Sequence, residues 1–215
     1  NPQGWLNVYK PIGITSFVVV KRIKKYFNIN KIGHGGTLDP LAEGVLPIAI
    51  GKTTKLIPFI NTDIKEYEFE VKWGIQTSTD DAEGDIIHTS DIIPTNSEIT
   101  EVLNKFKGKI LQKPPKASAI KINGKRAYLL LRNKENFEVK AKTVYLYSSE
   151  ILKSNNSNLC TKFKIKCGKG FYVRSYARDL AKLLHTRGHI SSLKRTQVGK
   201  FSCKNANLLD DLLKV

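Results

Sequence analysis

The sequence has few of the features that mark membrane, secreted and metal-binding proteins. Its apolar runs are far shorter than the roughly 20 residues of a membrane-spanning helix, and no secretory apolar segment follows Asn1. Its three cysteines lack the close pairing of metal ligands. We therefore expect reduced, mostly buried thiols in a cytoplasmic protein. Methionine is absent and the chain begins at Asn1, so we expect that a short leader has been removed.

Acidic residues are scarce relative to basic ones. There are 19 Asp and Glu against 36 Lys and Arg, which gives a formal net charge of +17. Such an excess favours a polyanionic partner, most simply nucleic acid. The alternative is a generally basic protein whose lysines serve solubility. A length of 215 residues with 40% hydrophobic content fits one large domain, or one domain with an appendage.

Alternating apolar and polar residues predict strands. Over Lys65–Trp73 the side chains of Tyr67 and Phe69 point to the same side, and the intervening charged residues point to the other. Residues 159–167 alternate in the same way and place lysines on one face of the strand. Further strands are expected at residues 45–50, 139–151 and 191–201.

Helices are predicted where a capping residue precedes apolar residues at helical spacing. Thr15 or Ser16 caps the first helix, Thr95 with Glu98 forms a capping box for the second, and Ser175 caps the third. The inward side of the first helix is expected to consist of Phe17, Val20, Ile23 and Phe27. Strands and helices do not alternate regularly, which favours an α+β fold with a large mixed, mostly antiparallel sheet flanked by helices.

The stretch from Gly33 to Pro47 combines glycines, prolines, a histidine and an aspartate before a buried strand. Pro40 biases Asp39 toward an extended conformation, and Gly33, Gly35 and Gly36 permit backbone angles that other residues avoid. The pattern indicates a stiff loop that presents a carboxylate, as loops with a reactive group do. The alternative is a tight turn in which Asp39 caps its own backbone.

The same stretch resembles the catalytic motif of the TruB-type tRNA pseudouridine synthases. That motif reads Gly-His-x-Gly-x-Leu-Asp-Pro-x-Ala-x-Gly-x-Leu-Pro, and every fixed position is met. Other segments resemble family motifs in the same order, so that the resemblance covers residues 9 to about 201. These segments are Tyr9–Ser16, Lys65–Tyr67, Gln112–Tyr128, Cys167–Arg174 and Leu193–Thr196.

The sequence departs from the family pattern at several positions. Ala117 stands where the family usually has Tyr or Phe, Ser78 where many members have Asp, and Lys194 where the late motif has Arg. The resemblance implies a catalytic domain over residues 1–201 with an RNA-gripping insertion at about 112–138. Residues 202–215 form a short tail in this division, with the family's C-terminal RNA-binding domain absent or reduced.

The resemblance implies isomerisation of the T-loop uridine of tRNA, uridine 55, to pseudouridine, with no metal and no organic cofactor. Asp39 is then the nucleophile or base, and Arg174 is its partner, which lowers the carboxylate pKa and fixes its orientation. Which atom Asp39 attacks stays open. Without the motif, Arg174 is interpreted as a surface arginine at a strand end. The expected partner is the T-arm stem-loop of tRNA, bound by a monomer.

The other expected site residues surround the flipped base and the RNA backbone. By resemblance Tyr67 stacks on the base, although a core or rim tyrosine is the plain alternative. Tyr172 and Leu193 are expected on neighbouring strands that line the same pocket. His34 stacks or fills space in the rearranged RNA loop. Phosphate contacts are expected from basic residues that include Lys10, Lys121 and Arg126.

Two other functions fit parts of the sequence. An RNA-binding or tRNA-folding module without turnover would keep the basic surface, but it has no need of Asp39, Tyr67 and Arg174 together. A hydrolase with an aspartate nucleophile usually needs a metal or a second carboxylate, which the motif does not supply.

Overall fold

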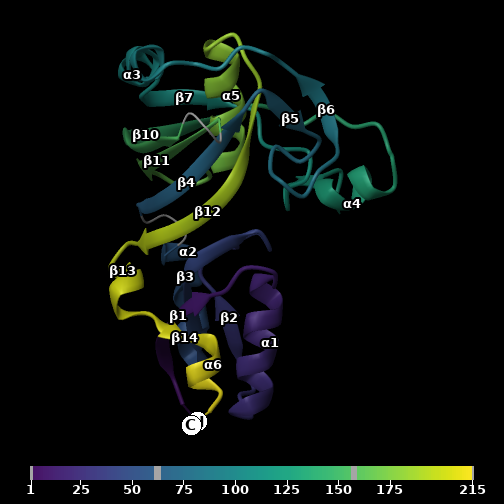
Figure 1. Ribbon diagram of the computed structural model, residues 1–215. Coiled ribbons are helices and arrows are strands. Elements are labelled where there is room, and N and C mark those ends of the chain that lie inside the picture. Colours follow the sequence, from purple (N-terminus) through teal and green to yellow (C-terminus); the bar gives the residue numbers. More distant parts are fainter. Residues whose placement is uncertain (1, 61–63, 156–158, 215) are drawn as a thin grey trace. The chain divides into compact units, whose positions relative to one another are not determined.

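The computed structural model describes residues 2–60, 64–155 and 159–214 (Figure 1). The strands form a ten-stranded mixed sheet in the order β14-β1-β3-β12-β4-β11-β10-β7, and β2 and β13 pair with β3 and β12. Two further two-stranded sheets are β5-β6 and β8-β9. The chain divides into two compact units, the first with residues 1–68, 165–169 and 192–215, and the second with residues 69–164 and 170–191. The α+β prediction with a large mixed sheet is confirmed.

The first unit is built on the antiparallel pair of β1 and β3, in which Val8 lies opposite Leu46. Residues 193–195 of β12 run parallel to residues 42–44 of β3. The strands that lie in this unit are β1 (Gly4–Lys10), β2 (Ile32–His34), β3 (Ala42–Ile50), β13 (Phe201–Ser202) and β14 (Asn207–Leu208). Its helices are α1 (Ser16–Tyr26), α2 (Ile57–Ile60), α6 (Leu209–Leu212) and the 3-10 turns η1 (Gly51–Leu56) and η2 (Cys203–Asn205).

Helix α1 begins as predicted, and its buried face matches the predicted one in part. Thr15 caps it by accepting a hydrogen bond from the backbone N–H of Val18 at 3.2 Å. Phe17 and Phe27, both expected inside, are 70% and 41% exposed, whereas Ile23 is buried as predicted and the partly buried Val20 packs against the same core. Ser16 and Val19 are also buried. Ser16 is turned inward because its hydroxyl binds the backbone of Leu38. Residues three and seven positions further along then face the core, as helical geometry requires.

The second unit has an aromatic core. Phe69 and Phe163 stack with ring centroids 5.4 Å apart, and Trp73 and Tyr176 meet these rings edge-on. Its own strands are β5 (Ile75–Thr77), β6 (Ile86–Thr89), β7 (Gly108–Gln112), β8 (Lys121–Ile122), β9 (Lys125–Arg126) and β10 (Lys142–Asn155). Its helices are α3 (Asn96–Lys105), α4 (Ala127–Arg132) and α5 (Val173–Leu183).

Three strands contribute residues to both units: β4 (Lys65–Trp73), β11 (Cys160–Cys167) and β12 (Gly188–Val198). The bounds predicted for β4 and the burial of its alternate residues are confirmed. The predicted capping box of Thr95 and Glu98 at α3 is also confirmed.

The predicted start of helix α5 is wrong. The helix begins at Val173 with Tyr172 as its N-cap, and Ser175 lies inside it. The Ser175 hydroxyl is buried and donates to the carbonyl oxygen of Lys113 at 2.8 Å, so a long-range contact takes the side chain that was expected to cap the helix.

No helix in the described ranges is long and apolar enough to cross a membrane. No group of three or more His, Cys, Asp or Glu side chains is placed there to hold a metal ion. The three cysteines are free thiols, of which Cys160 and Cys167 are buried, as expected.

Candidate functional site

The loop that carries Asp39 lies in the first unit, and its backbone is held by hydrogen bonds throughout. Each carbonyl oxygen from residue 36 to residue 40 accepts at least one hydrogen bond. The donors are Arg195 for Gly36 and Thr37, Ser16 for Leu38, the Ala42 N–H for Asp39, and the Gly13 N–H with Lys10 for Pro40. The half-buried Asp39 side chain is therefore carried on a fixed backbone, which agrees with the stiff loop that the sequence predicted.

Arg195, on β12, is the main brace of this loop. It is 1% exposed, and its guanidinium donates to the carbonyl oxygens of Val45 at 2.9 Å and Gly36 at 3.0 Å. A third, longer contact of 3.5 Å reaches Thr37. One side chain thus joins the two ends of the loop to a neighbouring strand. The sequence indicated Arg195 only as part of the late motif, since the carbonyls that it binds lie about 150 residues earlier.

Lys10 also braces the loop, and this corrects its expected role. Its side chain is fully buried, and its ammonium donates to the carbonyl oxygens of Pro11 and Ile14 at 2.8 Å each. A further contact of 3.4 Å reaches Pro40. A buried ammonium that is already bound to carbonyls does not face solvent, so Lys10 cannot meet an RNA phosphate without leaving these partners.

The glycines of the loop have two different reasons to be there. Gly36 and Gly44 have φ values of +86° and +110°, which side chains rarely adopt. A Cβ on Gly44 would also overlap the carbonyl oxygen of Arg195. Gly33 and Gly35, expected to supply unusual angles, instead leave room for side chains, because a Cβ would lie 2.8 Å from Ile57 Cδ1 and 2.6 Å from Ile60 Cγ2 respectively.

Tyr67 and Asp39 are brought together around Arg195. Burial raises the pKa of the Tyr67 phenol, and the charge of Asp39 raises it further, while the charge and hydrogen bond of Arg195 oppose this. The phenol therefore stays protonated at neutral pH, which suits a contact surface better than a base. Leu193 is 8% exposed and is paired with Ala42 where β12 meets β3.

His34 ends strand β2, opposite Ile48 of β3. Its partial burial lowers the pKa of the imidazole, and the positive charge of Arg195 lowers it further, against a smaller opposing effect of a backbone hydrogen bond at Gly36. The ring is therefore neutral at pH 7. A neutral, half-buried ring suits stacking or packing and gives no sign of an acid–base role.

Arg174 lies in the second unit, in the first turn of α5, and is not the surface arginine at a strand end of the plain alternative. It is 6% exposed. Its guanidinium donates to the carbonyl oxygens of Thr79 and Ala117 at 3.0 Å each and lies 3.5 Å from the Asp81 carboxylate. Asp81 in turn accepts hydrogen bonds from Thr79 and from the Glu83 N–H. Arg174 therefore joins the polar loop near residue 80 to the insertion.

The same helix holds the base of the insertion at further points. Arg178 forms an ion pair of 2.9 Å with Asp80 and donates to the carbonyl oxygen of Lys113 at 2.7 Å. Burial raises the pKa of Asp80, and Arg178 opposes that rise. Tyr172 is held through its backbone by the side chain of Gln112, at 2.8 and 3.0 Å. Tyr172 is thus a helix cap, which corrects its expected place on a strand.

Lys121 and Arg126 lie on the exposed β8–β9 hairpin, where they are paired across the two strands. Their turn is formed by Asn123 and Gly124, which have φ values of +48° and +83°. The guanidinium of Arg126 donates to the carbonyl oxygen of Ala119. Three other lysines of this segment are also exposed: Lys113, Lys116 and Lys125. The insertion therefore presents cations to solvent, as predicted.

Comparison with known proteins accounts for these features together. The family model described as TruB family pseudouridylate synthase (N terminal domain) matches residues 24–173. A tRNA pseudouridine synthase B of Ehrlichia ruminantium (strain Gardel) is 47% identical over 97% of this chain and 71% of its own length. The chain belongs to the TruB family of pseudouridylate synthases.

Two other relatives named tRNA pseudouridine synthase B support this membership. The one from Wolbachia pipientis subsp. Culex pipiens (strain wPip) is 46% identical over 99% of this chain and 60% of its own length. The one from Anaplasma marginale (strain St. Maries) is 48% identical over 97% and 68%. The chain thus spans about three fifths of the length of the Wolbachia relative and about two thirds of the length of the Anaplasma relative.

Solved structures share the fold of this TruB family chain. A chain in a crystal structure of a Cbf5–Nop10–Gar1 complex is 31% identical with a TM-score of 0.76, over 98% of this chain and 54% of that one. A chain in an H/ACA RNP bound to a substrate RNA containing 2′-deoxyuridine is 28% identical with a TM-score of 0.73, over 98% and 52%.

Proposed function

We propose that this chain isomerises the T-loop uridine of tRNA, uridine 55, to pseudouridine, with Asp39 as the nucleophile or base. The observation that carries the proposal is the fixed backbone of residues 36–40, which presents Asp39 beside Tyr67 and Arg195. The family membership and the names of the relatives support the reaction class. A carboxylate on a rigid loop suits a step in which the same group adds and later leaves.

The reaction rearranges one nucleotide. The bond between N1 of uracil and C1′ of ribose breaks, the uracil turns within the site, and C5 bonds to C1′. C5 then loses its proton and N1 gains one, so the product is an isomer of the substrate. Attack at C1′, attack at C6 and removal of a ribose proton are the three ways in which the Asp39 carboxylate would begin it. In each, Arg174 is proposed to keep Asp39 ionised and oriented.

The target base must leave the RNA stack before it can react, at a cost of a few kcal/mol. We propose that the buried, protonated Tyr67 and the side chain of Leu193 contact the flipped base, with Tyr172 beside them. The neutral ring of His34 would take a place in the rearranged loop. The exposed Lys121 and Arg126 would contact phosphates of the T arm, and the shape of the RNA loop would set specificity.

Three further predictions belong to this proposal. Residues 1–201 act as the catalytic domain, with the insertion at about 112–138. The contacts of α5 with Lys113 and Ala117 support an insertion that is anchored at its base. The protein is expected to act as a monomer in the cytoplasm.

Mapping of the product on RNA tests the proposal. The chain is incubated with an unmodified tRNA transcript, and pseudouridine is then located along the RNA. We expect modification at the T-loop uridine alone and none in a transcript with cytidine at that position. Saturable binding of the transcript without pseudouridine at any enzyme concentration would instead identify an RNA-binding module. Release of a free base would indicate a hydrolase.

A further inference from the structure

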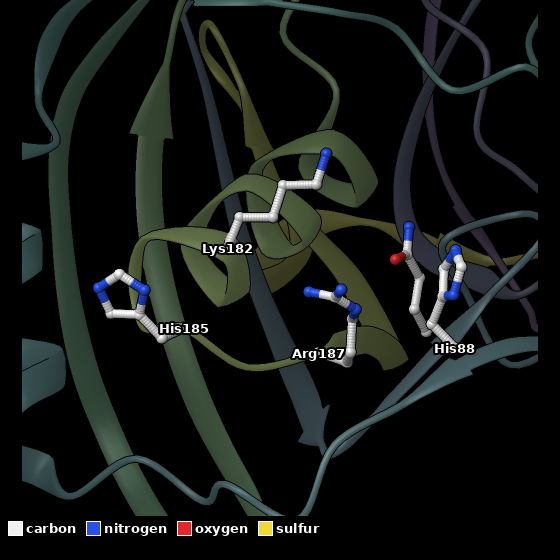
Figure 2. Close-up of a pocket in the computed structure, with 5 residues that line it drawn as sticks. His88, Lys182, His185 and Arg187 are labelled. Carbon is white, nitrogen blue, oxygen red and sulfur yellow. The ribbon is translucent and has the colours of Figure 1, made fainter.

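A polar pocket of about 500 Å³ lies in the second unit, at the end of helix α5 and against the β5–β6 pair. None of the residues named so far as catalytic or as RNA contacts lines it. Its lining residues are Gln76, His88, Lys182, His185 and Arg187. In the view of Figure 2, Arg187 lies between His185 on one side and His88 on the other.

The backbone around the pocket is fixed on both sides. Gln76 and His88 are direct cross-strand partners in the β5–β6 pair, so their positions are set by one ladder. On the other side the chain turns sharply after α5, where His185 has a φ of +55°. The backbone of Arg187 is held next to the start of β5, because its carbonyl oxygen accepts a hydrogen bond of 2.8 Å from the N–H of Gly74.

Three carbonyl oxygens at the end of helix α5 are already bound within the chain and do not point into the pocket as unpaired acceptors. The exposed carbonyl oxygens of a helix C-terminus normally repel negative charge. Here the carbonyl oxygens of Leu180, Ala181 and Lys182 accept hydrogen bonds from the N–H groups of Leu184, Thr186 and His185. The turn has thus satisfied these acceptors, and the side chains that project from it determine the charge of the pocket.

The pocket is rich in donors and positive charge. Lys182 and Arg187 give it two formal positive charges, and none of its five lining residues in the described chain carries a carboxylate. The Arg187 Nε atom is buried and has no hydrogen-bond partner among the described residues, so a donor is left unused. Asp80 accepts a hydrogen bond from Gln76, but its charge is balanced by the ion pair with Arg178.

These properties select a phosphate group as the ligand. An arginine with a free Nε–H, an ammonium and two imidazoles match the several acceptor oxygens of a phosphate. Gln76 is the single lining residue without a cationic or imidazole side chain, and the described lining includes no Phe, Tyr, Trp or aliphatic side chain that would give a base an apolar surface. A backbone phosphate of RNA fits such a polar, cationic pocket better than a nucleotide, whose base would gain no apolar contact there.

We propose that the pocket lined by Lys182, His185, Arg187, His88 and Gln76 binds a phosphate group of the RNA substrate. The identification of the phosphate as part of a tRNA substrate rests on the proposed function. The presence of a phosphate site does not depend on it. The site adds an anchor to the RNA backbone that is distinct from the exposed lysines of the insertion.

The first arm of the test uses inorganic phosphate and reads the pocket directly. The Arg187 Nε–H and the imidazoles of His88 and His185 are followed by NMR while phosphate is added. We expect these signals to shift together and to saturate in the wild type, and to be much less responsive in Lys182→Gln. Lys182 is exposed, so this substitution removes one charge and is expected to leave the core undisturbed. Signals that do not move, or that move linearly to the highest concentration, would show an adventitious ion only and overturn the site.

The second arm identifies the source of the phosphate. Binding of an unmodified tRNA transcript is measured against salt for the wild type and for the double variant Lys182→Gln with Arg187→Gln. Lys107→Gln with Lys109→Gln removes the same charge from exposed positions outside the pocket and is the matched control. The slope of the logarithm of the binding constant against the logarithm of the salt concentration should become shallower by about 0.7–0.9 in the pocket variant, because one phosphate contact is lost. The change should be smaller in the control.

An equal change of salt slope in both double variants would overturn the assignment to RNA. This result would mean that only the general charge had been removed. The two proposals fail separately: absence of pseudouridine in the mapping experiment would remove the catalytic function and leave the phosphate titration unaffected. Absence of the phosphate shifts would remove the pocket and leave the catalytic function unaffected.

Discussion

The two units both bury long cationic side chains, but they bind them differently. In the first unit Arg195 donates to backbone carbonyl oxygens at both ends of the Asp39 loop. Lys10 donates to the carbonyl oxygens of Pro11 and Ile14, with a longer contact to Pro40. In the second unit Arg174 and Arg178 pair with the carboxylates of Asp81 and Asp80, and also bind carbonyl oxygens of the insertion. One set of cations therefore fixes a loop, and the other joins a polar loop to the insertion.

The two kinds of partner, carbonyl oxygens and carboxylates, predict different responses to pH and to substitution. A carbonyl oxygen does not titrate, so the brace around Asp39 holds at any pH at which the cations stay charged. Ion pairs depend on ionised carboxylates, and removal of one buried partner leaves the other charge uncompensated. We therefore expect substitutions near Asp39 to act through geometry and those near Asp81 to act through charge.

The largest effect is expected from Gly44→Ala. The positive φ costs about 1–3 kcal/mol for a residue with a side chain, and the clash with the Arg195 carbonyl oxygen adds about 1–3 kcal/mol. Denaturant unfolding should therefore show a loss of about 4 kcal/mol. Gly33→Ala is the matched control, since its Cβ meets only the flexible end of Ile57. Equal losses in the two variants would contradict the special role of Gly44.

The second largest loss of stability is expected from Arg195→Met. It keeps much of the side-chain volume but leaves the carbonyl oxygens of Gly36 and Val45 without their donor, and we expect a loss of about 3 kcal/mol in unfolding free energy. Arg195→Lys keeps the charge, but a single nitrogen replaces the separate Nε and Nη2 donors that reach Val45 and Gly36, so we expect an intermediate loss. If the methionine variant is as stable as the wild type, Arg195 does not brace the loop.

Asp81→Asn tests the charged region at nearly constant shape. Arg174 loses its ion pair but keeps its two carbonyl partners, so we expect a loss of about 2 kcal/mol in unfolding free energy. Glu101→Gln breaks an exposed pair with Lys105 and should change stability by no measurable amount. An Asp81 variant that behaves like the Glu101 variant would remove the contrast between the two regions.

The smallest effect is expected in the pH dependence. Burial and the charge of Arg195 lower the pKa of His34 below its ordinary value of 6.5. The unfolded chain therefore binds more protons than the folded one as the pH falls through about 6.5, and stability decreases. Unfolding at pH 7.5 and 5.5 should show a smaller decrease in His34→Asn than in the wild type. In Arg195→Met the His34 imidazole, followed by NMR, should titrate at a higher pH.

Local patterns predicted much of the fold. The strand Lys65–Trp73 and the capping box of Thr95 with Glu98 were found at the expected residues, because alternation and capping depend on neighbours in the sequence. Part of the predicted face of α1 and the predicted start of α5 were wrong for one shared reason. Ser16 and Ser175 both use their hydroxyls for contacts with distant backbone, and no local pattern contains those partners.

The candidate site was predicted in part. The motif around Asp39 indicated a stiff loop, and its hydrogen bonds confirm that stiffness. The sequence did not show that Lys10 is buried beneath the loop, since a lysine near a motif is usually a solvent-exposed cation. The bracing role of Arg195 was missed because its partners lie 150 or more residues away.

The most direct test of the proposed chemistry is Asp39→Asn, which removes the charge and keeps the shape of the side chain. Pseudouridine formation is measured in a single turnover with the enzyme in excess over unmodified tRNA, and binding of the same RNA is measured alongside. We predict binding close to that of the wild type and no detectable pseudouridine. Pseudouridine formed at the wild-type rate by this variant would contradict the assignment of Asp39 as the nucleophile or base.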